Sequence, residues 1–248
     1  MSATAAIVVI GAEVLSAKVV DENGPFLLAA LRDRGIETRE TRTIGDDVGV
    51  IGRTVRELAS THTYVFTTGG VGPTHDDVTV AGIAAAFDVD VVRDPTLIGL
   101  LEQYYKDKLL PPHLKMAEVP RGATVSVPGG LGFVPVIRMR NTYVLPGVPA
   151  LVKRCWASLE AELARDTFFA RVLYFNVPES KIAELMTATQ KAYPAVAIGS
   201  YPRFDDAPYL VKVTFDGRVE AEVDAAQARL LAGIEAGWLV QLTPVAAI

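Results

Sequence analysis

Hydrophobic and polar positions along the first two thirds of the chain predict strands that alternate with helices. Residues 5–10 are continuously apolar and end at Gly11, which is typical of a strand buried on both faces. Residues 21–34 carry apolar side chains at helical spacing and stop at Gly35, a residue that favours helix ends. The alternation continues with a strand at 37–44, a helix at 48–59 and a strand at 64–67. Repeated β-α-β units predict right-handed crossovers and a doubly wound parallel sheet.

The later part of the chain predicts the end of this domain and a second, smaller one. The first domain is expected to continue with helices at 77–87 and 95–108, a hairpin of strands at 133–139 and 142–145, and a helix at 149–163. A ferredoxin-like order of strand, helix, strand, strand, helix and strand is then predicted at 172–177, 180–192, 196–201, 209–215, 222–235 and 239–242. We therefore expect an α/β domain with a doubly wound, mostly parallel sheet over residues 1–166 and a small α+β domain over residues 167–248.

Composition narrows the class of protein. The chain has 248 residues, half of them hydrophobic, so it can bury a large core without disulfides. Its lone cysteine, Cys155, lies in an apolar helical stripe and is expected to pack in that core. No leader pattern and no apolar stretch of roughly 20 residues is found, so we expect a cytoplasmic protein outside the membrane. The net charge of -5, without a basic block, argues against nucleic acid as a partner.

A glycine-rich loop follows the third strand and is the first candidate binding site. Gly69, Gly70 and Gly72 let the backbone approach a ligand closely. Phosphate oxygens could accept hydrogen bonds from the loop N–H groups and from the start of the next helix, with Thr68 or Thr74 adding hydroxyl donors. The spacing matches neither a Walker loop nor a dinucleotide fingerprint. A tight structural turn is the alternative interpretation.

Acidic residues directly after this loop indicate a metal ion. Asp76 and Asp77 would repel a bound phosphate unless a divalent cation lay between them, and carboxylate oxygens suit Mg²⁺ or a similar hard ion. His75 is a weaker candidate as a ligand or proton donor. The alternative is that one of the aspartates only caps the following helix.

Two further acidic sites are expected at the same edge of the sheet. Asp46 and Asp47 sit at a strand-to-helix junction and could complete a metal site, with helix capping again as the alternative. Glu13 follows the first strand and could act as a metal ligand or a general base. Pro146 and Gly147 begin a rigid turn that could shape one wall of the pocket, or serve only as a turn.

Several motifs occur together in a recognisable order. They are Gly11-x-Glu13-x-Leu15, Asp21-x-Asn23, Gly45-Asp46-Asp47, the segment from Thr68 to Thr79, and Pro146-Gly147-Val148-Pro149. In order and spacing they resemble the molybdopterin-binding-like family of MoaB and Mog proteins. The chain is most similar to the N-terminal domain of competence/damage-inducible protein A, CinA, and to the corresponding domain of FAD synthases.

The resemblance implies a three-layer α/β/α fold and a small-molecule nucleotide or pterin as the partner. Relatives either hydrolyse the phosphoanhydride of ADP-ribose or FAD with a divalent metal, Mg, Mn or Co, or bind molybdopterin and adenylylate it. The motif match implies that Asp46 and Asp77 are functional acids and metal ligands. It also implies ligand-binding roles for Gly69, Gly70, Gly72, Pro73, Thr74, Thr79, Pro146 and Gly147. Relatives are usually homo-oligomers, so a dimer or trimer is expected.

Two hypotheses follow. The first is a metal-dependent pyrophosphatase in which the glycines hold the phosphates, Asp46 and Asp77 hold the ion, and Glu13 orients the attacking water. The second is a nucleotide- or pterin-binding module without hydrolysis, because Ala12 stands where relatives usually have an acid.

Overall fold

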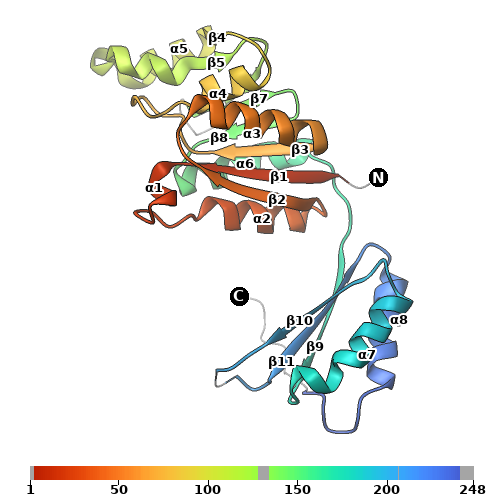
Figure 1. Ribbon diagram of the computed structural model, residues 1–248. Coiled ribbons are helices and arrows are strands. Elements are labelled where there is room, and N and C mark those ends of the chain that lie inside the picture. Colours follow the sequence, from red (N-terminus) through yellow and green to blue (C-terminus); the bar gives the residue numbers. More distant parts are fainter. Residues whose placement is uncertain (1–2, 128–133, 206, 241–248) are drawn as a thin grey trace. The chain divides into compact units, whose positions relative to one another are not determined.

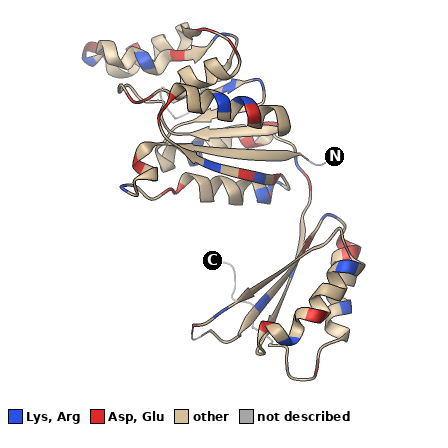
Figure 2. Ribbon diagram, in the orientation of Figure 1, with Lys and Arg blue, Asp and Glu red and all other residues tan. Residues whose placement is uncertain are grey.

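The structure, a computed structural model, describes residues 3–127, 134–205 and 207–240. The chain divides into two compact units, Met1–Asp166 and Thr167–Ile248 (Figure 1). Lys and Arg are interspersed with Asp and Glu in both units, as Figure 2 shows. Within the part of the chain that is described, no helix is long and apolar enough to cross a membrane.

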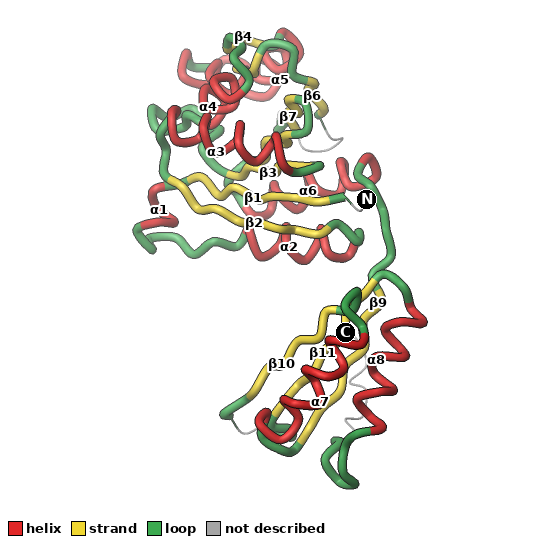
Figure 3. Tube along the Cα trace, turned by 45° about the vertical axis from the view of Figure 1, so that its right-hand side comes forward, coloured by secondary structure: helices red, strands yellow, loops and turns green. Residues whose placement is uncertain are grey.

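The first unit is built on a six-stranded sheet with the order β2-β1-β3-β8-β7-β6. Its strands are β1 (Thr4–Ile10), β2 (Glu37–Ile44), β3 (Tyr64–Thr68), β6 (Thr124–Ser126), β7 (Val136–Met139) and β8 (Thr142–Leu145). The strands β2, β1, β3 and β8 run parallel, whereas β7 pairs antiparallel with β8 and β6 pairs antiparallel with β7. Figure 3 shows β1, β2 and β3 side by side. The mostly parallel sheet expected from the alternating pattern is confirmed.

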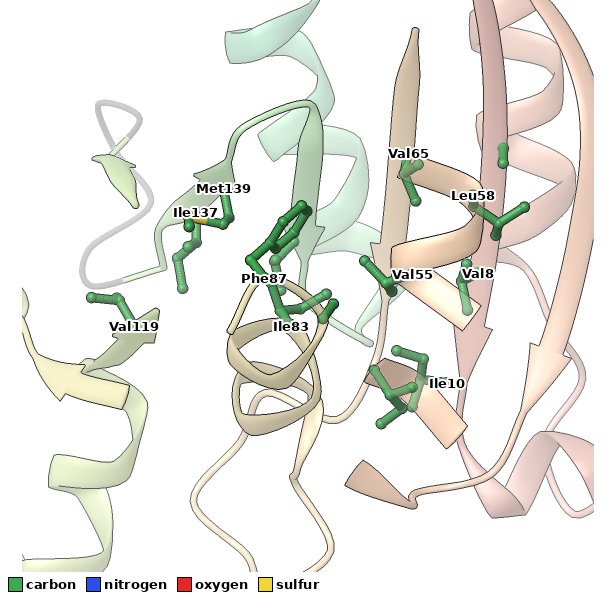
Figure 4. Packing of buried hydrophobic residues seen from close by; sticks show 14 of the residues in the cluster. Val8, Ile10, Val55, Leu58, Val65, Ile83, Phe87, Val119, Ile137 and Met139 are labelled. Atoms are coloured by element: carbon green, nitrogen blue, oxygen red, sulfur yellow. The ribbon is translucent and has the colours of Figure 1, made fainter. Parts of the chain in front are cut away.

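Helices cover both faces of this sheet. The helices α2 (Asn23–Asp33) and α6 (Pro149–Leu159) pack on one face, and α3 (Val48–Thr61) and α4 (Thr79–Ala86) pack on the other. The strand β1 serves both cores, because Val8 and Ile10 join the cluster with α3 and α4 while Ile7 and Val9 join the cluster with α2 and α6 (Figure 4). The three-layer α/β/α fold is therefore confirmed.

Cys155 of α6 is fully buried among the apolar side chains of the second cluster, as its place in a helical stripe predicts. Burial raises the pKa of its thiol to about 11. The residue is part of the core and lies outside the candidate site.

Some boundaries differ from those expected. The helix expected from residue 77 begins only at Thr79, because the carboxylate of Asp77 accepts a hydrogen bond from the Thr74 N–H and belongs to the preceding loop. The helix α5 (Pro95–Tyr105) ends where Lys106 takes a positive φ of 50°, and η1 (Lys106–Lys108) follows as 3₁₀ turn. The helix α6 likewise ends earlier than expected and continues as η3 (Glu160–Glu162).

Residues 87–127 form an arm, of which the pattern predicted the helix at 95–108 but not the folding of the less regular segment 109–127. The strand β4 (Val91–Arg93) pairs with β5 (Glu118–Pro120), and η2 (Pro111–Ala117) runs into β5. The Asp94 N–H donates to the Ala117 carbonyl, which closes the arm. The first expected hairpin residue, Phe133, lies outside the described residues.

The second unit has a three-stranded antiparallel sheet of order β10-β11-β9, formed by β9 (Phe169–Phe175), β10 (Ala197–Pro202) and β11 (Val211–Gly217). The helices α7 (Glu179–Ala192) and α8 (Glu220–Ala232) pack on it around a separate core. Leu239 forms an antiparallel bridge with Phe175, so the last expected strand begins beside β9. Residues 241–242 of that strand lie outside the described residues. The first five elements of the predicted ferredoxin-like order are confirmed, and within the described residues the last strand appears as this one bridge.

Candidate functional site

Four parallel strands end at one edge of the sheet, and the candidate residues follow these ends. The Gly11 N–H donates to the Ile44 carbonyl at 3.0 Å, and the Gly69 N–H donates to the Leu145 carbonyl at 3.3 Å. These bonds hold the ends of β1 and β2 together, and those of β3 and β8. The carboxyl edge is where open α/β sheets bind ligands.

The glycines of the loop after β3 are required by close packing. Gly69 has a φ of 100°, and a Cβ atom there would lie 2.1 Å from the Ile10 carbonyl oxygen. Gly70 has a φ of 63°, and its Cβ would lie 2.4 Å from the Thr79 hydroxyl. Only glycine combines this backbone conformation with this proximity. The loop is thus pressed against the end of β1.

Thr79 locks the loop from the other side. Its hydroxyl donates to the Gly69 carbonyl at 2.8 Å, and its N–H donates to the Gly70 carbonyl at 3.0 Å. The residue is fully buried. Both hydrogen bonds hold the loop in place, so the geometry gives Thr79 a positioning role at the site.

A cavity of about 430 Å³ opens beside the loop. Of the residues expected at the site, it is lined by Glu13, Gly69, Gly70, Gly72, Asp77, Pro146 and Gly147. Asp46, Pro73, Thr74 and Thr79 are not among its lining residues. Much of the remaining lining is apolar and comes from Val80, Met116, Val134, Pro135, Ile137, Val144, Val148 and Leu151. A cavity of this size, lined by apolar side chains and a few polar groups, is typical of small-molecule sites.

Asp46 lies behind the loop. Its Oδ2 accepts the Ala12 N–H at 2.8 Å, and its Oδ1 would be 3.4 Å from a Cβ atom on Gly70. Its neighbour Asp47 caps α3 by accepting the Val50 N–H at 2.8 Å. Capping therefore accounts for Asp47 but not for Asp46.

Asp77 is held by its own loop. Its Oδ2 accepts the Thr74 N–H at 2.8 Å and lies 2.5 Å from the Thr74 hydroxyl, which is also 2.5 Å from Asp76 Oδ1. The hydrogen bond from Thr74 lowers the pKa of the exposed Asp76 carboxyl. Val78 precedes α4 without a side-chain capping bond, so neither aspartate caps that helix. The His75 side chain is 98% exposed and lies outside the cavity lining.

Asn23 connects two walls of the site, which the sequence reasoning did not foresee. Its side-chain amide donates to the Thr68 hydroxyl at 3.0 Å and to the Gly147 carbonyl at 2.7 Å. The Thr68 hydroxyl in turn donates to the Pro146 carbonyl at 2.6 Å. The Asp21-x-Asn23 motif was the available signal, but sequence alone did not give its partners.

The arm supplies three more lining residues, Lys115, Met116 and Glu118, none of which was expected at the site. They lie in a region whose sequence showed no regular pattern. Their placement depends on how η2 and β5 fold back over the loop, which no local spacing predicts.

The donor groups fit a phosphate-bound ion better than a resident metal centre. Among the described residues, no group of three or more His, Cys, Asp or Glu side chains could hold a metal ion. Within the described part of the chain, Asp46 and Asp77 each accept a backbone N–H with Oδ2, which leaves Oδ1 of each available. Mg²⁺ is usually held by one or two carboxylates together with substrate phosphates, so these residues suit an ion that arrives with its ligand.

A mostly parallel sheet with a glycine loop and acidic residues around a cavity at its carboxyl edge defines an α/β protein built to hold a small ligand. Residues 6–165 match the family described as a probable molybdopterin binding domain, and residues 167–243 match the middle domain of FAD synthase. The chain therefore belongs to the molybdopterin-binding-like family, as its motifs indicated.

Similar proteins agree with this assignment. A protein of Archaeoglobus fulgidus is 31% identical over 220 residues, which cover 89% of this chain and 93% of that one. A probable FAD synthase of Caenorhabditis elegans is 33% identical over 253 residues, covering 90% of this chain and 48% of that one. The chain thus spans about half the length of this FAD synthase relative. The crystal structure of the protein CinA with unknown function from Thermoplasma acidophilum is 27% identical, with a TM-score of 0.61 over 65% of this chain and 98% of that one.

Proposed function

We propose that this protein hydrolyses the phosphoanhydride bond of a nucleotide such as ADP-ribose or FAD with a divalent metal ion. The observation that carries the proposal is that Glu13 and Asp77 line the same cavity as Gly69, Gly70 and Gly72. Carboxylates and a phosphate-binding loop are the groups that metal-assisted hydrolysis of a phosphoanhydride requires.

Each part of the cavity has a role in this reaction. The loop N–H groups donate to the phosphate oxygens of the substrate, as such loops do at helix N-termini. Glu13 lines the cavity from α1 (Ala12–Leu15) and accepts a proton from the attacking water. The apolar lining around Met116 and Ile137 excludes water and packs against the ring system of the substrate.

Asp46 and Asp77 would hold the ion, through the oxygens that they do not use within the chain. A bound Mg²⁺, Mn²⁺ or Co²⁺ supplies charge neutralisation at the phosphates and lowers the pKa of a coordinated water. Ala12 contributes its backbone N–H, which donates to the Asp46 carboxylate at 2.8 Å.

Product analysis tests the proposal. The purified protein is incubated with ADP-ribose or FAD in the presence of Mg²⁺, Mn²⁺ or Co²⁺, and in EDTA as a control. We expect AMP to be released from at least one of the two substrates, and only when a metal is present. Absence of AMP under all these conditions would contradict the proposal.

A second candidate is binding of molybdopterin, with or without its adenylylation. It is favoured by the family match over residues 6–165, which is described as a probable molybdopterin binding domain. The apolar lining suits a planar pterin as well as it suits a nucleotide base. Saturable heat on titration with molybdopterin, or an adenylylated pterin formed in the presence of ATP, combined with no AMP from ADP-ribose or FAD, would favour this candidate.

A further inference from the structure

Lys115 lies where the arm meets the loop. It belongs to η2, which is anchored by the fully buried Ala117 and by the bond from the Asp94 N–H to the Ala117 carbonyl. The Lys115 ammonium donates a hydrogen bond to the carbonyl of Thr74, in the segment between Gly72 and Asp77. An anchored arm thus delivers a cation to the loop from 41 residues further along the chain.

The charge of the cavity gives this contact its significance. Three acidic side chains line the cavity, those of Glu13, Asp77 and Glu118, and within the described residues Lys115 is the one cation that lines it. Glu118 is paired with Arg93 at 3.7 Å, whereas the carboxylates of Glu13 and Asp77 would repel a phosphate group in the absence of a compensating charge. A divalent ion supplies part of this charge only when it is bound, whereas Lys115 is part of the chain.

The ammonium group can bind more than Thr74. A lysine side chain has three N–H donors, and the Thr74 carbonyl uses one of them. The side chain is partly exposed and lines the cavity, so its other donors can reach a ligand there. Hydrogen bonds from an ammonium group to phosphate oxygens are charge-assisted and stronger than those between neutral groups.

We propose that Lys115 is a binding residue for the diphosphate of a nucleotide held by the glycine loop. The ligand class is a nucleoside diphosphate or its ester, and the proposal deepens the function proposed above, on which its choice of ligand rests. The same side chain also links the arm to the loop through its hydrogen bond to the Thr74 carbonyl. One ammonium group would therefore contact both the loop and the phosphate.

Calorimetric titration with ADP tests this role. The variants are Lys115→Met, which removes the charge, Lys115→Arg, which keeps it, and Lys108→Met, which removes an exposed lysine of the same arm that does not line the cavity. We expect Lys115→Met to weaken ADP binding about tenfold or more and to flatten its dependence on salt concentration. Lys115→Arg should retain most of the affinity, and Lys108→Met should bind ADP like the parent.

Equal ADP affinity of Lys115→Met and the parent would overturn the proposal, and so would a parent that does not bind ADP. Thermal unfolding of each variant shows whether a loss of affinity comes from misfolding. A similar loss of ADP affinity in Lys115→Arg would overturn a role that rests on the charge. AMP release from ADP-ribose separates the two proposals. AMP release by Lys115→Met at the parental kcat/KM would contradict the proposed role of Lys115 and support the proposed hydrolase function. Tight ADP binding that depends on Lys115, without hydrolysis of ADP-ribose by the parent, would contradict the hydrolase function and support the role of Lys115.

Discussion

The carboxylate of Asp46 accepts the backbone N–H of Ala12 at 2.8 Å, which joins the end of β2 to the start of α1. The bond crosses 34 residues of sequence and brings the acid next to the segment that carries Glu13. One oxygen of Asp46 therefore fixes α1, and the proposed function assigns the other oxygen to the metal ion.

This arrangement predicts different effects for two neighbouring aspartates. In Asp46→Asn the amide oxygen can still accept the Ala12 N–H, but the negative charge is lost. We expect kcat/KM for ADP-ribose to fall about 10- to 100-fold, with little change in stability. Asp47→Asn is the matched control, because asparagine caps a helix as well as aspartate does. Equal activity of the two variants in a steady-state assay would argue against a metal at Asp46.

The close packing of Gly69 predicts a larger loss of stability on substitution than backbone strain alone would cause. Gly69→Ala places a Cβ atom 2.1 Å from the Ile10 carbonyl oxygen, and we expect it to destabilise the protein by more than about 3 kcal/mol. Gly122→Ala is the control for backbone strain alone, since Gly122 has a φ of 85° but no atom within 4 Å of the added Cβ. That variant should cost only about 1 kcal/mol. Urea unfolding measures both, and similar midpoints would contradict the packing argument.

Asn23 predicts a coupling between stability and binding. Asn23→Asp removes the two amide donors and sets a carboxylate against the Gly147 carbonyl, so we expect a loss of about 1–3 kcal/mol of stability. Because the walls of the cavity are no longer tied together, KM for ADP-ribose should rise as well.

Asn141 offers a matched control for this experiment. Its side-chain amide likewise makes two hydrogen bonds, to the carbonyls of Ala59 and His62, but it lies in the turn before β8, beside the start of β3, and does not line the cavity. Asn141→Asp should therefore lower stability to a similar extent and leave KM unchanged. A rise in KM for both variants would mean that Asn23 acts only through stability.

The sequence predicted the parts of this protein that depend on local pattern. The continuous apolar run at residues 5–10 marked a strand buried on both faces, a strand was expected at residues 64–67, and the glycine loop was expected at the carboxyl edge where it lies. Glu13 and Asp77 were expected at that edge and do line one cavity. Their roles in binding and catalysis stay predictions.

The parts that were missed depend on contacts between distant segments. The start of α4 was placed at residue 77 because an acidic residue before an apolar run is typical of a helix start, whereas Asp77 is used by Thr74 inside the loop. Lys115 and Asn23 reach the site only through bonds to Thr74 and Gly147, across 41 and 124 residues of sequence. No periodicity in the chain encodes such contacts.

The buried thiol of Cys155 predicts both its reactivity and a pH dependence. Its pKa of about 11 in the folded protein means that a thiol reagent at pH 8 should label it only after unfolding in urea. An unfolded cysteine ionises near pH 8.5, so between about pH 9 and 11 the folded state holds a proton that the unfolded state releases. Stability should therefore fall as the pH rises through this window.

Urea unfolding at pH 8 and pH 10 measures this effect, with Cys155→Ala as the comparison. The variant should show a smaller fall in stability between the two pH values than the parent does. Equal falls, or rapid labelling of the folded parent at pH 8, would contradict the burial of this thiol.

The most direct test of the central claim compares two adjacent aspartates in one assay. Asp77 lines the cavity, whereas Asp76 lies outside its lining and its side chain is 62% exposed. AMP release from ADP-ribose and FAD is measured with Mg²⁺ for the parent, Asp77→Asn and Asp76→Asn. We predict that Asp77→Asn loses turnover while Asp76→Asn keeps most of it. Turnover by Asp77→Asn at the rate of the parent would contradict the assignment of the site.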